Sequence, residues 1–489
     1  METIFETQLY QHYKQLWSGE LASDTTTESV IPDNMPDISA VLDCSAMLFV
    51  RSKEVENGRM SVTVDISAKL LYQAADTPML QCLPLHTTTT LTTAVPEAES
   101  DCLARANIRV KSSECKIINS RKVSLKTEII GNAACYRRNE WEIAGGIREC
   151  NRKIESKTLR SPLVLISDIR EKTFVATDEF SLPSGISDVD DIISEDVSLC
   201  VDEMELAGEK IVFRGRAVLF LLMRCGEQLC PCSFESKFSQ IMEADAESTP
   251  QVSLMLTGAY FDLPEHGSGK IGAELHILAQ ALCTKTCSVH YMADAYCNQE
   301  PIAPRFATHE ICTESREIRL RKTLSASFDS QRNIHEIMFS RSSVQSGRIE
   351  DGTLKLSVST RVVYRDQDGC SVLNHTISED IPIEAETDES VTLVNVNCDP
   401  LYATASGGNV NIRLPVDVTL CAQRKQSICS VTDFDSAEAD HECPSITLLT
   451  CRGKEELWDL AKKHHSSVDA ILEANEGRTE GLLLIPKCR

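Results

Sequence analysis

Aromatic residues make up only 5% of this 489-residue chain, and no long apolar run is present. The longest continuous apolar segment, Ala217–Met223, is far short of the roughly 20 residues that a membrane-spanning helix requires. The first residues are acidic and contain no apolar core of signal-peptide length. We therefore expect no membrane insertion and a cytoplasmic protein.

Motifs that indicate an enzyme are also missing from the sequence. It contains no Gly-x-Ser-x-Gly, no phosphate-binding glycine loop and no His-Glu-x-x-His. Acidic pairs such as Asp190-Asp191 are typical of solvated surfaces, whereas a glycosidase needs two carboxyl groups held roughly 5–10 Å apart across a cleft. The sequence predicts a non-enzyme that uses no cofactor.

Basic residues are outnumbered, with 49 Lys and Arg against 73 Asp and Glu, and the formal charge is −24. An acidic surface repels both the phosphates of nucleic acids and anionic lipid headgroups. We expect proteins or a neutral polymer as partners, and no nucleic acid.

Cysteine, by contrast, is plentiful at 21 residues, but the number is odd and the spacing irregular. A small secreted disulfide scaffold is shorter and more regular. Structural zinc sites combine two Cys-x(2–4)-Cys pairs, whereas Cys230 and Cys232 are closer together and have no matching second pair. Buried reduced thiols and no metal site are expected.

One stretch of the sequence recurs. Residues 28–42 match residues 179–193 at a single constant offset, with Pro32 on Pro183, and a weaker third copy follows around Ile337. Solenoid repeats run roughly 20–50 residues, so a period of roughly 150 indicates duplication of whole domains.

The recurring stretch also predicts a local structure. A residue before proline is driven to extended backbone, which predicts a strand ending at Ile31. Asp37 is a candidate cap for the turn that follows. Ile38, Val41 and Leu42 have the spacing of one helical face, so a single helical turn is expected there.

Downstream of each copy the pattern changes to an alternation of period two. Asn57-Gly58 and Asp351-Gly352 are hairpin signals, and apolar residues alternate with polar ones from 60 to 66. Alternation bounded by glycine and asparagine predicts strands. The predicted fold class is therefore mainly β, with three tandem β-sandwich-like domains.

The predicted domain organisation follows from these patterns. It consists of an N-terminal amphipathic helix and lead-in (1–29), β domain 1 (30–140), a connecting segment (141–177), β domain 2 (178–297), a linker (298–325), a divergent β domain 3 (326–425), an acidic linker (426–444) and a small terminal module (445–489). The helix is indicated by the spacing of Phe5, Leu9, Tyr13, Leu16 and Trp17. Its apolar face packs on the first domain or contacts a partner.

The terminal module has a pattern of its own. Ile446 and Leu448 indicate a short strand, residues 457–461 and 468–472 indicate two helical faces, and residues 482–486 indicate a closing strand. Basic and acidic residues are equal in number from 445 to 489, so the excess negative charge lies upstream. A small α+β module of strand–helix–helix–strand order (βααβ) is predicted.

This module resembles the LysM pattern. The residues that carry the resemblance are Gly453, Leu457-Trp458, Leu460-Ala461, Val468, Ile471-Leu472, Asn475, Gly481 and Leu484-Ile485-Pro486. LysM modules bind N-acetylglucosamine polymers through the loops after the first strand and the second helix. The resemblance implies that a glycan or a partner is bound by Gly453, Lys454, Glu455, Glu456, Trp458, Asn475, Glu476 and Gly477. Lys454 and Glu455 replace the usual Asp-Thr, and their charges favour a protein surface.

The repeats resemble the SPOCS domain of spore-coat-associated proteins from endospore-forming Firmicutes, through Ile31-Pro32, Pro36-Asp37-Ile38 and Val41-Leu42. SPOCS repeats followed by a terminal LysM module match the SipL-like family of clostridial coat-morphogenesis proteins. The resemblance implies a non-catalytic scaffold in the mother-cell cytoplasm, at the forespore surface, that binds the SpoIVA-like ATPase of the coat base. The alternative is a peptidoglycan-binding protein of the spore cortex or cell wall.

Overall fold

The structure is a computed structural model, which describes every residue except 1–2, 76–79, 187–188, 227, 264–268, 300–301, 331, 407, 437–443, 452–456 and 489. Strands dominate it, so the prediction of a mainly β fold is confirmed. Within the described residues the only helices are two short ones near the C-terminus.

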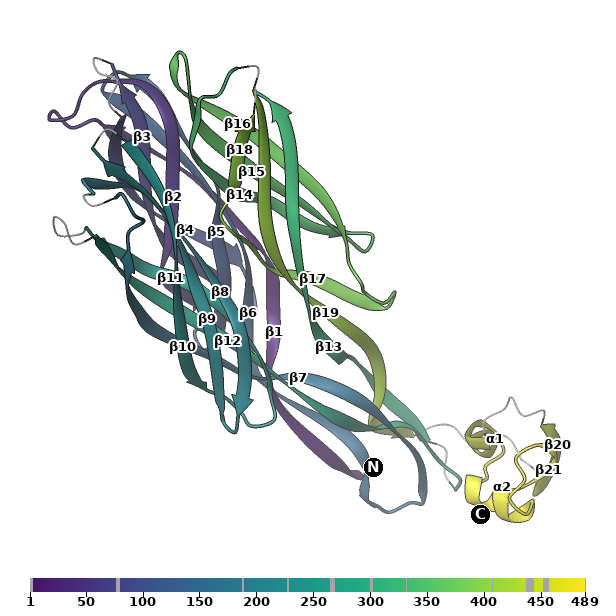
Figure 1. Ribbon diagram of the computed structural model, residues 1–489. Coiled ribbons are helices and arrows are strands. Elements are labelled where there is room, and N and C mark those ends of the chain that lie inside the picture. Colours follow the sequence, from purple (N-terminus) through teal and green to yellow (C-terminus); the bar gives the residue numbers. More distant parts are fainter. Residues whose placement is uncertain are drawn as a thin grey trace.

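Three consecutive repeats of similar strand order form the body of the molecule (Figure 1). Repeat 1 contains β1 (Thr3–Val30), β2 (Ile38–Glu56), β3 (Arg59–Ala74), β4 (Leu80–Ala94), β5 (Leu103–Asn119) and β6 (Lys122–Cys150). Repeat 2 contains β7 (Ile154–Ser181), β8 (Asp191–Ala207), β9 (Lys210–Cys225), β10 (Gln228–Glu243), β11 (Thr249–Asp262) and β12 (Lys270–Cys297). Repeat 3 contains β13 (Ile302–Asp329), β14 (Glu336–Glu350), β15 (Thr353–Asp366), β16 (Gly369–Pro382), β17 (Glu389–Cys398), β18 (Tyr402–Ser406) and β19 (Asn409–Ser436).

Each repeat is built from two antiparallel sheets. One is a meander of three strands, such as β2-β3-β4, and the other joins the first strand of the repeat to its last ones, in the orders β1-β6-β5, β7-β12-β11 and β13-β19-β17, with β18 also on β19. In β3 the buried residues alternate with less buried ones, and Met60, Val62 and Val64 face inward. They meet Leu21 and Ile129 from the second sheet, so the apolar core of repeat 1 lies between the two sheets.

Two of the predicted hairpins are confirmed in their backbone detail. Asn57-Gly58 joins β2 to β3 with φ of 51° and 74°, and Asp351-Gly352 joins β14 to β15 with φ of 50° and 71°. Positive φ at both central residues is the geometry of a type I′ turn, whose twist matches that of the flanking strands.

The helical turn predicted after Ile31 is wrong. The Ile31 N–H donates to the Arg121 carbonyl (2.8 Å), and β2 already begins at Ile38. Asp37 caps no helix, because its carboxylate instead accepts from the Arg121 guanidinium (3.1 Å). Two register shifts near the start of β2 turn the side chains of Ile38 and Leu42 into different apolar clusters. The helix-like spacing of the apolar residues is therefore caused by β-bulges.

The N-terminal helix predicted within residues 1–29 is also wrong, because this segment is β1. It pairs with β6 along its whole length, which satisfies its backbone groups in a sheet. Leu9, expected on the buried face, is 57% exposed, whereas Trp17 packs against the core of repeat 1. A register shift between Gln15 and Trp17 changes which side chains face inward.

The segments predicted as connectors belong largely to strands. Residues 141–177 lie mainly in β6 and β7, residues 298–325 mainly in β13, and residues 426–436 in β19. The remainder of the acidic linker, from 437 to 443, lies outside the described residues. The last strand of one repeat is therefore followed closely by the first strand of the next, since only residues 151–153 separate β6 from β7.

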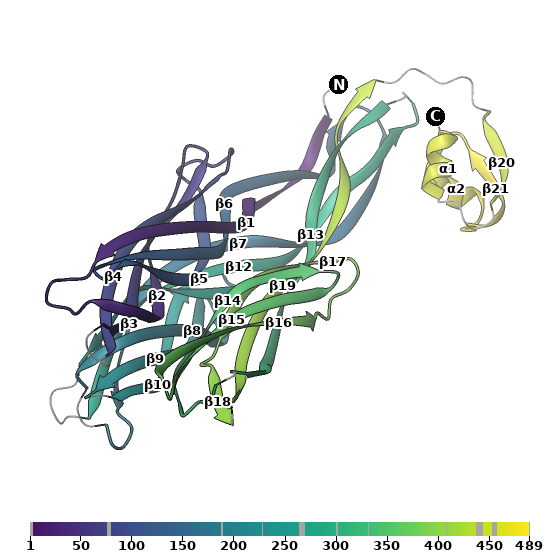
Figure 2. The ribbon, with the colours of Figure 1, turned by 90° about the horizontal axis from the view of Figure 1, so that it is seen from above.

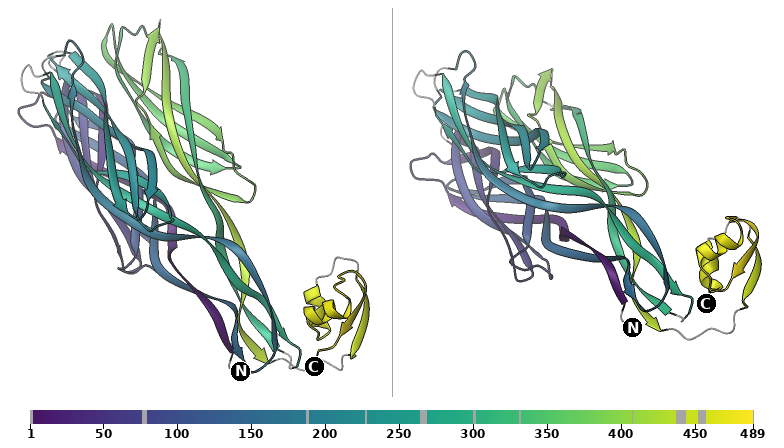
Figure 3. Two further views of the ribbon diagram at one scale, coloured as in Figure 1. Left: turned by 60° about the horizontal axis from the view of Figure 1, so that its bottom comes forward. Right: turned by 90° about the horizontal axis from the view of Figure 1, so that it is seen from below.

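The distal halves of these strands form a stalk. Past the residues that pair with β5, β11 and β17, each sheet continues with two strands only. There β1 pairs with β6, β7 pairs with β12, and β13 pairs with β19, which makes three two-stranded arms. Figures 2 and 3 show the arms running together toward the end where the N-terminus lies. Ile143, Leu163, Val289, Ile311 and Ile428, contributed by all three arms, pack into one apolar cluster.

The three meander sheets meet around an approximate threefold axis. Residues at corresponding positions of the three repeats form one apolar cluster there, which includes Leu42, Ile193 and Met338, together with Leu71, Leu222 and Val363. Beside it the carboxylate of Asp43, only 2% exposed, contacts Arg341 (3.3 Å) and Arg361 (3.2 Å). Arg341 also donates to the Ser194 hydroxyl (2.7 Å), so this cluster of four polar residues joins all three repeats.

Amide side chains add contacts between neighbouring repeats. Asn132 of repeat 1 donates to the Leu393 carbonyl of repeat 3 (2.9 Å). At the corresponding position of repeat 2, Gln280 donates to the Ala106 carbonyl of repeat 1 (2.8 Å). Leu393 and Ala106 also correspond to each other, so the two contacts follow the threefold arrangement.

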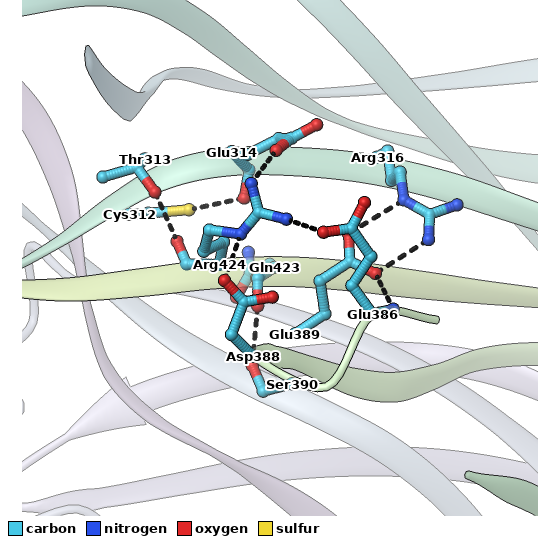
Figure 4. A network of polar contacts seen from close by, with 10 residues as sticks. All are labelled: Cys312, Thr313, Glu314, Arg316, Glu386, Asp388, Glu389, Ser390, Gln423 and Arg424. Atoms are coloured by element: carbon cyan, nitrogen blue, oxygen red, sulfur yellow. Dashed lines mark hydrogen bonds and ion pairs between the residues drawn. The ribbon is translucent and has the colours of Figure 1, made fainter. Parts of the chain in front are cut away.

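Ion pairs on repeat 3 hold the loop before β17 (Figure 4). Arg424 contacts Glu314 (2.7 Å), Asp388 (2.7 Å) and Glu386. Arg316 binds both carboxylate oxygens of Glu389 (2.9 and 2.7 Å). This guanidinium, followed by the backbone N–H of Glu386, lowers the pKa of Glu389 from 4.5 to about 2.

The lowered pKa of Glu389 makes a prediction about acid stability. A carboxylate with a depressed pKa in the folded state stabilises that state above its ordinary pKa of 4.5, and the contribution is lost as the pH falls toward about 2. Glu389→Gln should lower the unfolding midpoint at neutral pH, and its difference from wild type should shrink over that acidic range. Scanning calorimetry across the range measures this.

The matched control is Glu235→Gln, since Glu235 is exposed and lies 3.6 Å from Lys237. This variant should differ little from wild type at every pH. An unfolding difference for Glu389→Gln that stays constant from neutral pH down to about 2 would contradict the assignment.

Candidate functional site

The terminal module consists of β20 (Ile446–Cys451), α1 (Leu457–Lys463), α2 (Val468–Ala474) and β21 (Gly481–Pro486), so the predicted βααβ order is confirmed. The two strands pair antiparallel. Leu483 and Ile485 on their inner face pack against Leu460, Ala461 and Ile471 from the helices. Ser467 caps α2, since its hydroxyl accepts from the Ala470 N–H.

The loop after α2 contains three of the residues predicted to bind. The Asn475 amide donates to the carbonyls of Ile471 (2.7 Å) and Leu484 (2.7 Å), and its oxygen accepts from the Leu484 N–H (2.8 Å). Asn475 therefore ties α2 to β21 and has its polar atoms occupied. Glu476 and Gly477 are exposed, with positive φ of 54° and 81°, and residues 478–480 after them are exposed as well.

The other predicted loop comprises Gly453, Lys454, Glu455 and Glu456, and these residues lie outside the described part of the chain. Their predicted binding role stays a prediction.

Trp458, the remaining predicted binding residue, contacts repeat 2. Its indole N–H donates to the Asp294 carboxylate at the end of β12 (2.8 Å), and its ring meets the Tyr296 ring with centroids 4.9 Å apart. The ammonium of Lys462, one helical turn further on, contacts both oxygens of Asp294 (2.7 and 2.8 Å). The structure therefore places Trp458 in a contact between the module and an arm of the stalk.

Tyr296 belongs to the core of the terminal module. Its side chain is 5% exposed and clusters with Cys451, Leu460 and Ile485, although it comes from β12. Its hydroxyl donates to the Ser466 carbonyl (3.0 Å), and burial raises its pKa. The arm of repeat 2 therefore completes the packing of a module that is far away in the sequence.

Sequence reasoning missed Asp294, Tyr296 and Lys462 as residues of this contact. Tyr296 continues the pattern of an ordinary strand, and Lys462 that of a solvated helix end. Nothing local in the sequence relates them, because the contact joins segments more than 150 residues apart.

The charge of Asp294 is expected to hold α1 against the stalk. Asp294→Asn keeps an acceptor for Trp458 but removes the charge opposite Lys462, which should cost about 1–2 kcal/mol locally. Amide hydrogen exchange of α1 in the full chain should therefore become faster. Glu473→Gln, an exposed change in α2, is the control and should leave this exchange unchanged. Equal protection of α1 in Asp294→Asn and wild type would contradict the proposed contact.

The described residues contain no group of three or more His, Cys, Asp or Glu arranged to hold a metal ion. No helix in this part of the chain is long and apolar enough to cross a membrane. Comparisons with protein-family models, curated proteins and solved structures give no match.

Proposed function

We propose that this protein is a non-catalytic scaffold of endospore coat or envelope assembly, similar to the SipL-like coat-morphogenesis proteins. In this proposal the three repeats are SPOCS-like domains and the terminal module is LysM-like. The protein acts in the mother-cell cytoplasm at the forespore surface. It binds a coat-base protein of the SpoIVA type through the terminal module and the β repeats.

The observation that carries this proposal is the fixed position of the terminal module. Tyr296 completes the core of the module, and Asp294 pairs with Lys462 on its first helix. A binding surface held rigidly loses less conformational entropy when a partner binds. Several surfaces at fixed spacing on one chain also raise one another's effective concentration on a polymerised layer.

The position of Trp458 favours a protein partner over a glycan. Its indole N–H is bound by Asp294 and its ring contacts Tyr296, so a sugar that stacks on it must first displace the arm. The exposed residues of the loop after α2 include three charged ones, Glu476, Arg478 and Glu480. A neutral N-acetylglucosamine polymer gains little from such charges, whereas a protein surface with complementary charges is attracted by them.

A binding assay with the full chain tests the proposal. Purified full-length protein is offered the coat-base ATPase in one arm and insoluble peptidoglycan in the other. We expect retention by the ATPase and none by peptidoglycan. Retention by peptidoglycan alone would reject the scaffold proposal and support the alternative, a glycan-binding protein of the cortex or wall.

Charge reversal at the exposed loop makes the assay specific. Glu476→Lys is expected to weaken binding of the ATPase roughly tenfold, which corresponds to about 1.4 kcal/mol. Glu54→Lys, an exposed change in β2, is the control for a charge reversal away from this loop and should weaken binding less than Glu476→Lys does. Equal affinities of the two variants would show that the loop after α2 takes no part in the contact.

A further inference from the structure

The two strands of the terminal module differ at their outer edges. On β21 the Asn475 side chain bonds both the N–H and the C=O of Leu484 (2.8 and 2.7 Å), so the loop after α2 covers this edge. Both groups of Leu484 therefore point away from β20. Leu448 lies opposite Leu484 in the antiparallel register, and opposite residues share one orientation. The N–H and C=O of Leu448 therefore point away from β21.

The same orientation recurs at every second residue of β20. The N–H of Lys487 donates to the carbonyl of Ser445 (3.0 Å), so the odd-numbered residues along β20 bond toward β21. The backbone groups of Ile446, Leu448 and Thr450 face the other way. Within the described part of the chain no hydrogen bond reaches these groups, and β20 pairs with no strand other than β21. This side of β20 is therefore an open sheet edge.

The side chains beside this edge are apolar and exposed. Ile446 and Leu448 are 59% and 61% exposed, and Leu482 on β21 is 65% exposed. They lie on the sheet face opposite the helices, because side chains alternate along a strand and Leu449 and Leu483 point into the module core. Figures 2 and 3 show both helices between the two strands and the stalk, so the edge and its apolar face lie on the far side of the module from the body.

Edge strands in the body carry residues that disfavour pairing with another chain. β4 contains Pro84, β10 contains Pro231, and β16 contains Glu379 and Asp380. Proline removes an N–H and a charged side chain resists burial, so both protect an edge. The six residues of β20 include neither proline nor a charged residue. The open edge of β20 is therefore suited to the addition of a strand.

The size of β20 and the charge of the chain indicate which occupant fits. A stable contact between two folded proteins uses roughly 20–30 residues on each side, whereas β20 offers six. A second copy of this chain also has a formal charge of −24, so two copies repel each other. An extended segment gains affinity from backbone hydrogen bonds and needs only one row of side chains. Basic residues at the ends of such a segment are attracted by the acidic chain.

We propose that the outer edge of β20 binds an extended segment of a partner protein, which joins the sheet as a third strand. Every second side chain of this segment is apolar and lies beside Ile446 and Leu448, and basic residues flank the segment. The inference rests on the proposed function only in that the partner is a protein.

A displayed library of random dodecapeptides, selected on the full chain, tests the proposal. The selected peptides should have alternating apolar residues and flanking lysine or arginine. A synthetic copy should slow amide hydrogen exchange at Ile446, Leu448 and Thr450, whose N–H groups become bonded. The N–H groups of Thr447 and Leu449 already face β21 and should change little. This measurement needs no variant.

A pair of variants isolates the backbone contact. Leu448→Pro removes the outward N–H and keeps the bonds to β21, because an edge strand tolerates proline where its N–H faces solvent. Leu448→Ala is the matched control, since it loses the same side chain and keeps the N–H. The selected peptide should bind Leu448→Pro at least about tenfold more weakly than Leu448→Ala. Unchanged exchange protection of α1 and α2 shows that the module is folded, and Thr450→Pro with Thr450→Ala repeats the comparison if Leu448→Pro is not.

The outcomes separate this inference from the scaffold proposal. Failure to select a peptide, equal binding to the proline and alanine variants, or unchanged exchange at Ile446, Leu448 and Thr450 would overturn the inference even if the coat-base ATPase binds. Peptide binding that depends on the edge, in a chain that does not retain the ATPase, would support the inference and reject the ATPase as the partner. A dimer seen in sedimentation of wild type and lost in Leu448→Pro would also overturn it, because the occupant would be a second copy.

Discussion

Replacing Asp43 by asparagine is expected to destabilise the protein by about 3 kcal/mol, near the lower end of the range for breaking a buried ion pair. The carboxylate is the shared acceptor of Arg341 and Arg361, and asparagine removes the negative charge that compensates both guanidiniums. The side chains of the two arginines are 18% and 24% exposed, so solvent offsets part of the loss. The effect should nevertheless extend beyond repeat 1, because Arg341 also bonds Ser194 of repeat 2.

Denaturant unfolding of the full chain measures this effect. The first unfolding transition of Asp43→Asn should shift to a lower denaturant concentration. Repeats that unfold in one transition in the wild-type protein should unfold in separate transitions in the variant. Asp65→Asn is the control, because Asp65 is 45% exposed and its ion pair with Arg51 spans 3.8 Å. An exposed pair of this kind contributes at most about 1 kcal/mol. Similar shifts in the two variants would show that the buried cluster does not hold the repeats together.

Tyr296→Ala is expected to cost the terminal module about 3–5 kcal/mol, as for other buried aromatic residues truncated to alanine. The ring of Tyr296 lies among the core residues of the module, next to Trp458 and Leu460. Its removal leaves a cavity and also exposes the face of the module that rests on β12. The two short helices, α1 and α2, have seven residues each, and helices of this length depend on packing for their stability.

Hydrogen exchange of the full chain reads out the module separately from the body. In Tyr296→Ala the amides of α1 and α2 should lose protection. The amides of β3 should stay protected, because the terminal module can unfold locally without unfolding of the repeats. Tyr296→Phe keeps the ring and loses only the hydroxyl contact with Ser466, so a cost of about 1 kcal/mol is expected. Tyr260→Ala, at a residue 60% exposed, is the second control. Unchanged protection of both helices in Tyr296→Ala would mean that the module is stable without the arm.

Several elements were predictable because the signal for them is local. The two type I′ hairpins follow from Asn-Gly and Asp-Gly, which tolerate positive φ. Strand β3 follows from its alternation, since a strand with one buried face must place an apolar residue at every second position. The βααβ order of the terminal module follows from apolar residues at helical spacing between two short apolar strands.

The candidate site was only partly predictable, for the same reason. The LysM-like pattern predicts that Trp458 binds a glycan or a partner. In the structure its indole N–H instead donates to Asp294, which lies on a distant strand. Asn475 matches a binding-loop pattern, yet its amide is used to join α2 to β21. Neither outcome leaves a signal near the residue itself, because both depend on which segments meet in space.

The errors at Leu9 and in β2 have a common cause. A register shift moves the following side chains to the opposite face, so a bulged strand can show the spacing of a helix. Whether such a segment becomes helix or strand depends on the availability of a pairing partner. For β1 that partner is β6, which begins about 90 residues after β1 ends.

By itself, the sequence determined the alternation of apolar and polar residues along the strands, the hairpin turns, the threefold repetition of one unit and the βααβ order of the terminal module. Each of these depends on interactions between residues close in the chain, or on comparing one stretch with another. Only the tertiary structure decided that the repeats meet at Asp43 and extend arms into a stalk, and that Tyr296 enters the module. These features depend on burial and charge pairing between distant segments, whose free energy exists only once the repeats have come together.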